Sequence, residues 1–191
     1  MSTEKLYECG LCNSLDFTGL FNITDKYNQK VNLVICNMCG LLQLNPRKSE
    51  EDLNAFYTSE YYNLYSLDDK KNNNPRWIIR KEDMAARIIN SITNRYNSKG
   101  KTLLDIGCGH GFLLKNALSK KINAYGIEPS SKQAEDLRKE GMNVVNSDID
   151  SYENSANRSL HPEKFDYITL SHVLEHVSKP ILFLKKIRNI L

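Results

Sequence analysis

Residues 103–111 read Leu-Leu-Asp-Ile-Gly-Cys-Gly-His-Gly, and this segment is the strongest indicator of the fold class. Its apolar half predicts a short buried strand over 102–106, and the glycines predict a sharp turn into a helix over 112–119. Glycine lets a backbone turn tightly and approach a ligand closely. Phe112 takes the sixth position of the motif, so the Gly-x-Gly-x-x-Gly fingerprint is not satisfied and an NAD or FAD site is disfavoured.

Strand and helix continue to alternate after this turn. We expect strands over 124–127, 143–146 and 165–170, helices over 130–140 and 180–191, and a polar connection over 152–164. Ser130 with Gln133 forms a helix start signal, and Gly141 stands where the helix should end. Repeated strand–helix units predict an α/β fold in which helices cover a parallel sheet.

Acidic residues follow the predicted strands at regular places. Glu128 closes the second strand, 21 residues beyond Gly107, where a carboxylate can accept hydrogen bonds from both hydroxyls of a ribose. Asp148 follows the third strand. The carboxyl ends of parallel strands meet at one edge, where ligands bind. Taken alone, Glu128 or Asp148 could be an ordinary loop residue. Together with Asp105 and the glycines, the two acids predict a site for a nucleoside-bearing cofactor.

The N-terminal region carries two Cys-x-x-Cys pairs. Cys9 and Cys12 form the first, Cys36 and Cys39 form the second, and 23 residues separate the pairs. Four thiolates on two tight turns suit a tetrahedral Zn²⁺ site with no open position, which is structural rather than catalytic. The alternative is four unrelated buried or redox-active cysteines. With the alternating run Val31–Ile35, typical of a hairpin, the pattern predicts a zinc-binding module over residues 1–46.

Composition narrows the class of protein. The chain has 191 residues, 40% of them hydrophobic, and a net charge of +3. Residues 1–60 hold 5 basic against 8 acidic side chains, and no later segment is basic enough to predict nucleic-acid binding. No apolar run approaches the roughly 18 residues of a membrane span. The first residues lack the apolar core of a secretion signal, so we expect a cytoplasmic protein.

Between the two regions, residues 47–100 are expected to form a helical bridge. Apolar residues recur there at helical spacing: Met84, Ile88, Ile89 and Ile92. The sequence is thus divided into a zinc module over 1–46, this bridge, and a cofactor-binding region over 101–191.

The ordered motifs resemble those of a known family. LLDIGCGHG, GIEPS, the NSD step and FDYITLSHVLEHV look like successive motifs of class I S-adenosylmethionine-dependent methyltransferases. The Cys-x-x-Cys pairs and CGLLQLNPRKSEEDLNAFYTSEYY resemble the subgroup with an N-terminal zinc-binding domain, which includes deoxysugar C-methyltransferases. The resemblance covers residues 7–191.

This resemblance implies roles for residues at the matching positions. Asp105, Gly107 and Gly109 would hold the methionine part of S-adenosylmethionine, and Gly111 would shape the turn. Glu128 would bind the ribose, Asp148 and the backbone of Ile149 would face the adenine, and Ser171 would lie near the cofactor. The implied acceptor is a sugar, including a nucleotide-linked sugar, or another small molecule.

Methyl transfer needs an aligned acceptor and, for some acceptors, removal of a proton. The candidates for that proton are His172, Glu175 and His176 after the strand over 165–170, and Tyr57, Tyr61 and Tyr62 upstream. For the histidines we favour a structural hydrogen-bonding role, and for Tyr61 and Tyr62 a lid or packing surface. No catalytic base is assigned.

The family resemblance also implies an incomplete sheet. Class I methyltransferases have seven strands in the order 3-2-1-4-5-7-6, and this chain would supply an incomplete doubly wound, Rossmann-like sheet with the order 3-2-1-4. The strand over 165–170 would then be an exposed edge. Four residues of the last helix would lack part of their packing partner: Ile181, Leu184, Ile187 and Leu191.

Three outcomes follow for that edge: a homodimer, a partner subunit that carries the remaining strands, or a truncated product. The chain is therefore either a small-molecule methyltransferase or a catalytically incomplete cofactor-binding subunit that acts through a partner. A zinc-ribbon RNA-modifying protein is a third interpretation, which the acidic N-terminal segment disfavours.

Overall fold

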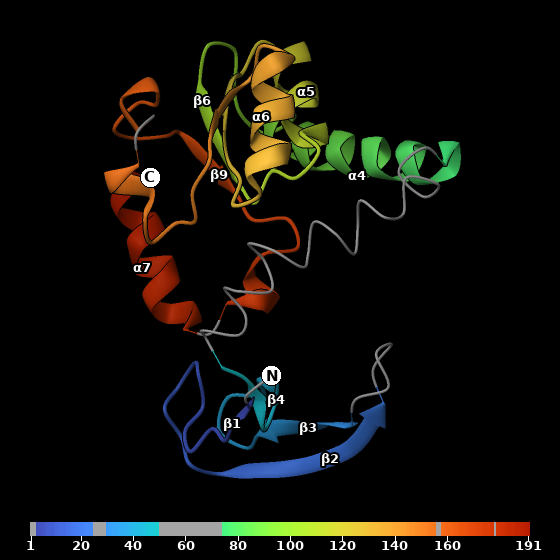
Figure 1. The fold of residues 1–191 in the computed structure, drawn as a ribbon, viewed down its shortest axis with the longest axis vertical. Coiled ribbons are helices and arrows are strands. Elements are labelled where there is room, and N and C mark those ends of the chain that lie inside the picture. Colours follow the sequence, from blue (N-terminus) through green and yellow to red (C-terminus); the bar gives the residue numbers. More distant parts are fainter. Residues whose placement is uncertain (1–2, 25–29, 50–73, 156–157, 178) are drawn as a thin grey trace.

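A computed structural model describes residues 3–24, 30–49, 74–155, 158–177 and 179–191 (Figure 1). The N-terminal strands are β1 (Thr3–Glu4), β2 (Phe17–Thr24), β3 (Lys30–Cys36), β4 (Leu42–Leu44) and β5 (Arg47–Lys48). They are followed by α4 (Pro75–Thr93), β6 (Thr102–Ile106), α5 (Phe112–Ser119), β7 (Asn123–Ile127), α6 (Ser131–Lys139), β8 (Asn143–Val145), β9 (Tyr167–Thr169) and α7 (Pro180–Ile190). None of the described helices is long and apolar enough to span a membrane.

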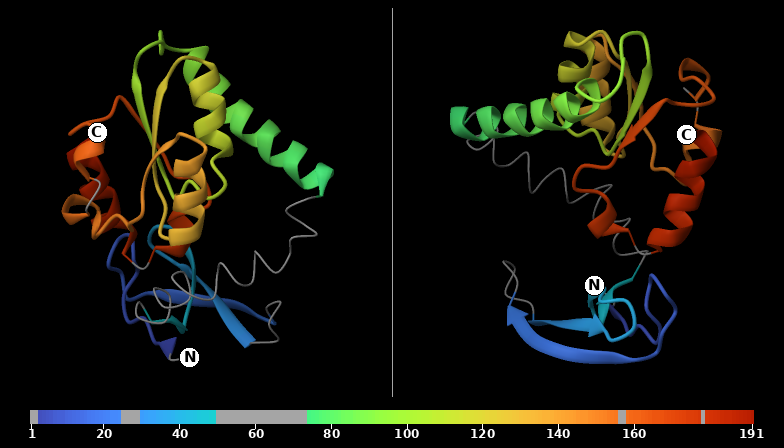
Figure 2. Two further views of the ribbon diagram at one scale, coloured as in Figure 1. Left: turned by 45° about the horizontal axis from the view of Figure 1, so that its top comes forward. Right: turned by 180° about the vertical axis from the view of Figure 1, so that it is seen from behind.

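Four parallel strands form the central sheet in the order β8-β7-β6-β9. In chain order this is 3-2-1-4, so the predicted α/β fold and strand order are confirmed. The bounds of β6 and α5 agree with those predicted from the glycine turn. Figures 1 and 2 show α4, α5 and α6 along one face of the sheet and α7 along the other.

Two apolar cores lie on the two faces because successive strand residues point to opposite sides. Leu103 joins the core under α4, α5 and α6, whereas its neighbour Leu104 joins the core under α7. Both side chains are fully buried. Residues on both faces of β6 are therefore buried, as expected for a parallel sheet covered on both sides.

The last strand and helix differ from the prediction. β9 is shorter than the expected strand over 165–170. Before it, the N–H of Phe165 donates to the carbonyl of Ile190 at the end of α7, 2.8 Å away. The expectation that Ile187 would lack packing is wrong, since it is buried in the second core. Leu184 and Leu191 are exposed, as expected.

The outer edge of β9 pairs with no strand in the described part of the chain. Its three residues are half-buried. The expected dimer or partner subunit at this edge stays a prediction.

The connection predicted to be polar contributes to the second core. It contains two 3₁₀ turns, Tyr152–Asn154 and Arg158–Leu160. Tyr152 is fully buried, and its hydroxyl lies 2.9 Å from Nδ1 of His161, which is buried as well. Tyr125 and Phe165 pack edge-on against the His161 ring. The connection is therefore not a purely polar loop, because it adds Tyr152 to the second core and buries His161 beside it.

The N-terminal region forms two small antiparallel sheets, β2-β3-β4 and β1-β5. The predicted hairpin at Val31–Ile35 is confirmed by β2 and β3. Buried apolar side chains of this region, within its described residues, are Cys9, Val34 and Cys36. So small a core cannot account for the order of the segment by packing alone.

Candidate functional site

The glycine turn between β6 and α5 presents one open position. Gly107, Gly109 and Gly111 all have left-handed backbones, with φ of +71°, +53° and +72°. A Cβ at Gly107 would lie 2.7 Å from Val173 Cγ2, and one at Gly111 would lie 2.6 Å from Leu137 Cδ2. A Cβ at Gly109 would meet no atom within 4 Å. Gly109 is therefore the glycine whose face is free for a ligand, while the other two are enclosed by the protein.

Asp105 lies at the carboxyl end of β6, just before this turn, and is 3% exposed. Burial raises the pKa of its carboxyl to about 7, with a smaller contribution from the charge of Glu128. The hydroxyl of Thr169 opposes this shift by donating to Asp105 Oδ1 at 2.8 Å. The carboxyl therefore titrates near neutral pH, where a bound cation would favour the charged form.

Glu128 links two loops at the end of β7. Its Oε2 accepts from the N–H of Gly109 and its Oε1 from the N–H of Ser130, each at 2.8 Å. Burial raises the pKa of this carboxyl, and the two backbone N–H groups act against that rise. Each oxygen keeps a second acceptor position, so the predicted contact with ribose hydroxyls is compatible with these bonds.

The remaining predicted cofactor residues lie at the same edge of the sheet. Asp148 follows β8, is exposed, and accepts from the N–H of Ser151 at 2.7 Å. Ile149 packs against the second core, and Ser171 is half-buried two residues after β9. All four strands thus end with a predicted site residue at the carboxyl edge, where parallel sheets bind ligands. The individual roles of these residues stay predictions.

The candidates for proton transfer form a local cluster. His172 is exposed, with a φ of +58°, and its Nδ1 lies 3.3 Å from Glu175 Oε1. Burial lowers the pKa of His176, the charge of Glu175 raises it and that of His172 lowers it. His172 thus pairs with a residue of the adjacent 3₁₀ turn, Leu174–His176, which fits a structural role. Tyr57, Tyr61 and Tyr62 lie outside the described residues.

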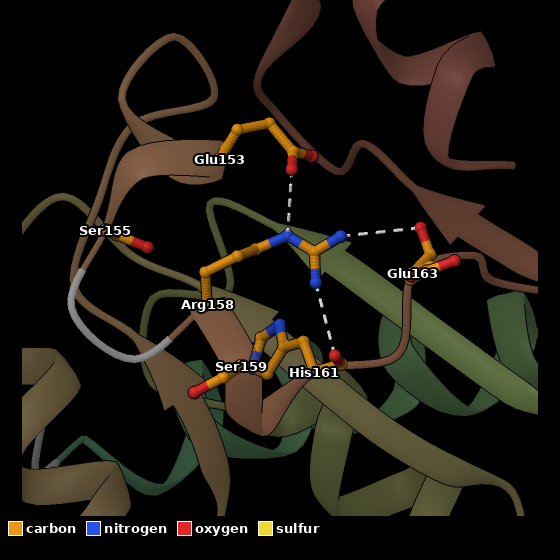
Figure 3. A pocket seen from close by; sticks show the side chains of 6 residues that line it. All are labelled: Glu153, Ser155, Arg158, Ser159, His161 and Glu163. Atoms are coloured by element: carbon orange, nitrogen blue, oxygen red, sulfur yellow. Dashed lines mark hydrogen bonds and ion pairs between the residues drawn. The ribbon is translucent and has the colours of Figure 1, made fainter.

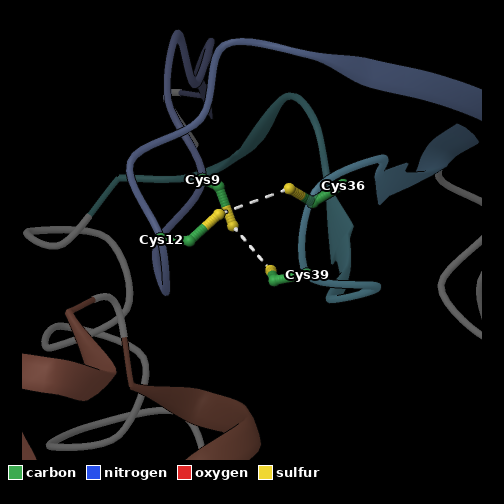
Figure 4. Close-up of side chains that lie close together, drawn as sticks. All are labelled: Cys9, Cys12, Cys36 and Cys39. Atoms are coloured by element: carbon green, nitrogen blue, oxygen red, sulfur yellow. Dashed lines mark hydrogen bonds between the residues drawn. The ribbon is translucent and has the colours of Figure 1, made fainter.

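The four N-terminal cysteines converge, as Figure 4 shows. The sulfurs of Cys9 and Cys39 are 3.6 Å apart, those of Cys12 and Cys36 are 3.5 Å apart, and all four lie within 4.8 Å of one another. These separations exceed the roughly 2.05 Å of a disulfide. A tetrahedron with Zn–S bonds of about 2.3 Å has S···S edges of about 3.8 Å. The cluster therefore has the size of a four-thiolate zinc site.

Each cysteine pair sits on a turn closed by the backbone. The N–H of Asn13 donates to the carbonyl of Cys9 at 3.0 Å, and the N–H of Gly40 donates to that of Cys36 at 2.9 Å. Gly40 has a φ of +74°, and Asn13 has a φ of +57°. Two turns of this kind bring two sulfurs each to a common point.

A shallow hollow on the second core is unrelated to these sites. Figure 3 shows its lining residues: Glu153, Ser155, Arg158, Ser159, His161 and Glu163. The Arg158 guanidinium donates to Glu153 Oε2 at 3.2 Å and to the carbonyls of His161, Pro162 and Glu163. These hydrogen bonds join the two 3₁₀ turns to the backbone of residues 161–163, so the role of Arg158 is structural. Sequence reasoning missed this cluster.

Solved structures share this fold. The plantazolicin methyltransferase BpumL, in complex with a pentazolic desmethylPZN analog and SAH, superimposes with a TM-score of 0.55 at 19% identity and covers 74% of this chain and 56% of that one. Magnesium protoporphyrin IX methyltransferase (ChlM) from Synechocystis PCC 6803 with bound SAH gives a TM-score of 0.56 at 13% identity, covering 73% and 67%. At these identities the likeness concerns the fold alone.

Curated relatives share more sequence over shorter stretches. N-methyltransferase 4 of Papaver somniferum is 34% identical over 94 residues, which is 47% of this chain and 26% of that protein. The mitochondrial ubiquinone biosynthesis O-methyltransferase of Schizosaccharomyces pombe is 33% identical over 87 residues, which is 44% and 32%. The matched stretch thus spans about a quarter to a third of these relatives.

The family described as "Methyltransferase domain" matches residues 77–191, from the first turn of α4 to the end of α7. This range includes the whole four-stranded sheet and its carboxyl edge. The match covers more than half of the chain, and the chain therefore belongs to the methyltransferase domain family.

Proposed function

We propose that this chain is the cofactor-binding part of an S-adenosylmethionine-dependent methyltransferase that acts on a small molecule. One observation carries the proposal: Gly109 has an open face and donates its N–H to the buried carboxylate of Glu128, four residues after the buried Asp105 at the carboxyl edge of the sheet. The relatives named as N- and O-methyltransferases support the small-molecule class.

The residues at this edge fit the parts of that cofactor. The cofactor supplies a methyl group already activated on a sulfonium. The turn at Gly109 and the Asp105 carboxyl bind the methionine end, with the carboxylate facing its ammonium group. Glu128 accepts from the ribose hydroxyls, while Asp148 and the backbone of Ile149 border the adenine. The protein's main contribution is then to fix the direction of attack, since alignment lowers the barrier of an in-line displacement.

For the acceptor we propose a sugar, including a nucleotide-linked sugar. This finer proposal is supported by the four-cysteine module and the CGLLQLNPRK segment, which resemble the zinc-bearing subgroup. A catalytically incomplete subunit is the second candidate, favoured by the β9 edge that pairs with no strand in the described residues.

For the four cysteines we propose a structural zinc ion held by Cys9, Cys12, Cys36 and Cys39. The support is the separation of the sulfurs and the two closed turns. Such an ion would order the small sheets that their few buried side chains cannot order alone.

Calorimetric titration with S-adenosylhomocysteine tests the cofactor proposal. Wild type should bind, and Gly109→Ala should lose at least tenfold in affinity because the new methyl group fills the open face. Gly141→Ala is the matched control: Gly141 ends α6 with a φ of +82°, and its Cβ position is also empty. Both variants carry a left-handed alanine, so both lose about 1 kcal/mol of stability, but only one should lose affinity.

Absence of binding by wild type at millimolar ligand would overturn the cofactor proposal. Equal affinities of Gly109→Ala and wild type would show that the ligand does not bind against this turn.

A further inference from the structure

Trp77, the single tryptophan of the chain, contacts the glycine turn edge-on through His110. Its ring centroid lies 5.4 Å from that of His110, at an interplanar angle of 75°, and 5.6 Å from that of Phe112, at 72°. Edge-to-face pairs at such distances are favourable because the positive ring edge meets the negative face. His110 directly follows Gly109, so the indole touches the residue next to the open position.

The position of Trp77 is set by a well-anchored helix. Asn74 caps α4, its Oδ1 accepting from the N–H of Arg76 at 3.0 Å. Further along the same helix, Ala85 and Ile89 are buried in the first core. The indole is therefore attached to a helix that is capped at its start and anchored in the first core, where it packs beside α5.

The contact is one of apolar packing rather than of charge. Burial lowers the pKa of His110, and the charges of Lys81 and Lys115 lower it further, which favours the neutral imidazole. Lys81 Nζ lies 5.9 Å from the centroid of the Trp77 ring. Phe112, whose ring lies near those of both Trp77 and His110, also packs against the first core.

We propose that Trp77 is a positioning residue for the cofactor. By packing on His110 it holds the left-handed turn at Gly109 in the shape that receives the methionine end. The inference rests on the proposed function, and it adds a residue from outside the strand–turn–helix motif. Ligand binding at Gly109 should then change the surroundings of the indole.

Calorimetry with S-adenosylhomocysteine tests the role of the ring. Losing both aromatic contacts in Trp77→Ala should weaken binding about three- to tenfold. Trp77→Phe keeps an edge-to-face ring and should stay within about twofold of wild type. Ile79→Ala is the matched control, because Ile79 lies in the same part of α4 with 56% of its surface exposed. It should bind as wild type does.

A double-mutant cycle separates positioning from general destabilisation. If Trp77 acts through His110, Trp77→Ala should cost little further affinity once His110→Ala is present. Additive losses would overturn the proposal, as would unchanged affinity in Trp77→Ala or a failure of Trp77→Phe to restore it.

The emission of Trp77 gives a readout that needs no variant. Saturating S-adenosylhomocysteine should shift or quench the wild-type fluorescence, and Gly109→Ala should show the same change only at higher ligand concentration. If wild type binds the ligand by calorimetry with no change in emission, the proposal fails while the proposed function stands. If wild type does not bind at all, the proposed function itself fails.

Discussion

The two ends of this chain reach order by different means. Around β6 and α5, Leu103, Leu104 and Leu114 are fully buried, and helices cover both faces of the sheet. Around β2 and β3, two of the most deeply buried side chains are the thiols of Cys9 and Cys36. One region is held by packing, and the other has thiols at the place where a core would be. The two regions should therefore respond to different perturbations.

Removing a thiol should have the largest effect, confined to the N-terminal region. Cys36→Ser should abolish bound zinc and unfold β2, β3 and β4, because a structural zinc site contributes on the order of 10 kcal/mol. Elemental analysis gives the metal content, and hydrogen exchange at residues 30–36 gives the folding state. Cys108→Ala is the control, since this fifth cysteine is buried outside the cluster and should leave about one zinc per chain. Folded wild-type protein without zinc would contradict the view that metal-bound thiols hold the N-terminal region together.

A single methyl group should break the packed region while sparing the zinc site. In Gly111→Ala the new Cβ would lie 2.6 Å from Leu137 Cδ2 and 3.2 Å from Met142 Sδ, in a left-handed conformation. Both neighbours are buried and cannot move away freely. We expect a loss of about 2–5 kcal/mol in the free energy of unfolding, measured in urea, with zinc content unchanged. Gly141→Ala should lose about 1 kcal/mol, and equal losses in the two variants would rule out the clash.

Acid should weaken the packed region through His161. Burial lowers the pKa of this imidazole to about 4, so the unfolded chain takes up its proton at a higher pH than the folded one. Stability present above about pH 6.5 is then lost as the pH falls toward 4, by up to about 3 kcal/mol. Urea unfolding of wild type and His161→Phe at pH 7 and pH 4.5 isolates this contribution. Parallel acid losses in both proteins would show that His161 is not its source.

The smallest effect should appear in ligand affinity. The Asp105 carboxyl has a pKa of about 7, and its charged form is the one that attracts an ammonium group. Affinity for S-adenosylhomocysteine should rise about tenfold from pH 6 to pH 8, because about a tenth of the carboxyl is ionised at pH 6. Asp105→Asn should bind weakly at both pH values. A wild-type affinity independent of pH would remove Asp105 from contact with the ligand.

Local signals explain what the sequence predicted well. The apolar run and glycines around Asp105 mark both β6 and α5, and Ser130 caps α6 by accepting from the N–H of Gln133 at 3.4 Å. The spacing of Glu128 places it beside the same turn. The strand, the helices and the cap depend on neighbours in sequence, and the position of Glu128 follows from the regular strand–helix–strand repeat, so residue patterns are enough to locate them.

Long-range contacts explain what the sequence missed. Nothing in the polar segment around Tyr152 and His161 has strand or helix periodicity, yet both side chains are buried against Phe165. Likewise, no spacing rule joins Trp77 to His110, because their contact arises from the way α4 packs beside α5. Burial of this kind is decided by the assembled fold.

Glu128 has a consequence for the rate of binding as well as its strength. With both carboxylate oxygens bonded to backbone N–H groups, its side chain is already in one rotamer before any ligand arrives. Association at this position then requires no slow rearrangement, and observed rates in stopped-flow mixing should increase linearly with ligand concentration. If the proposed ligand binds here, we expect this part of the site to fill rapidly.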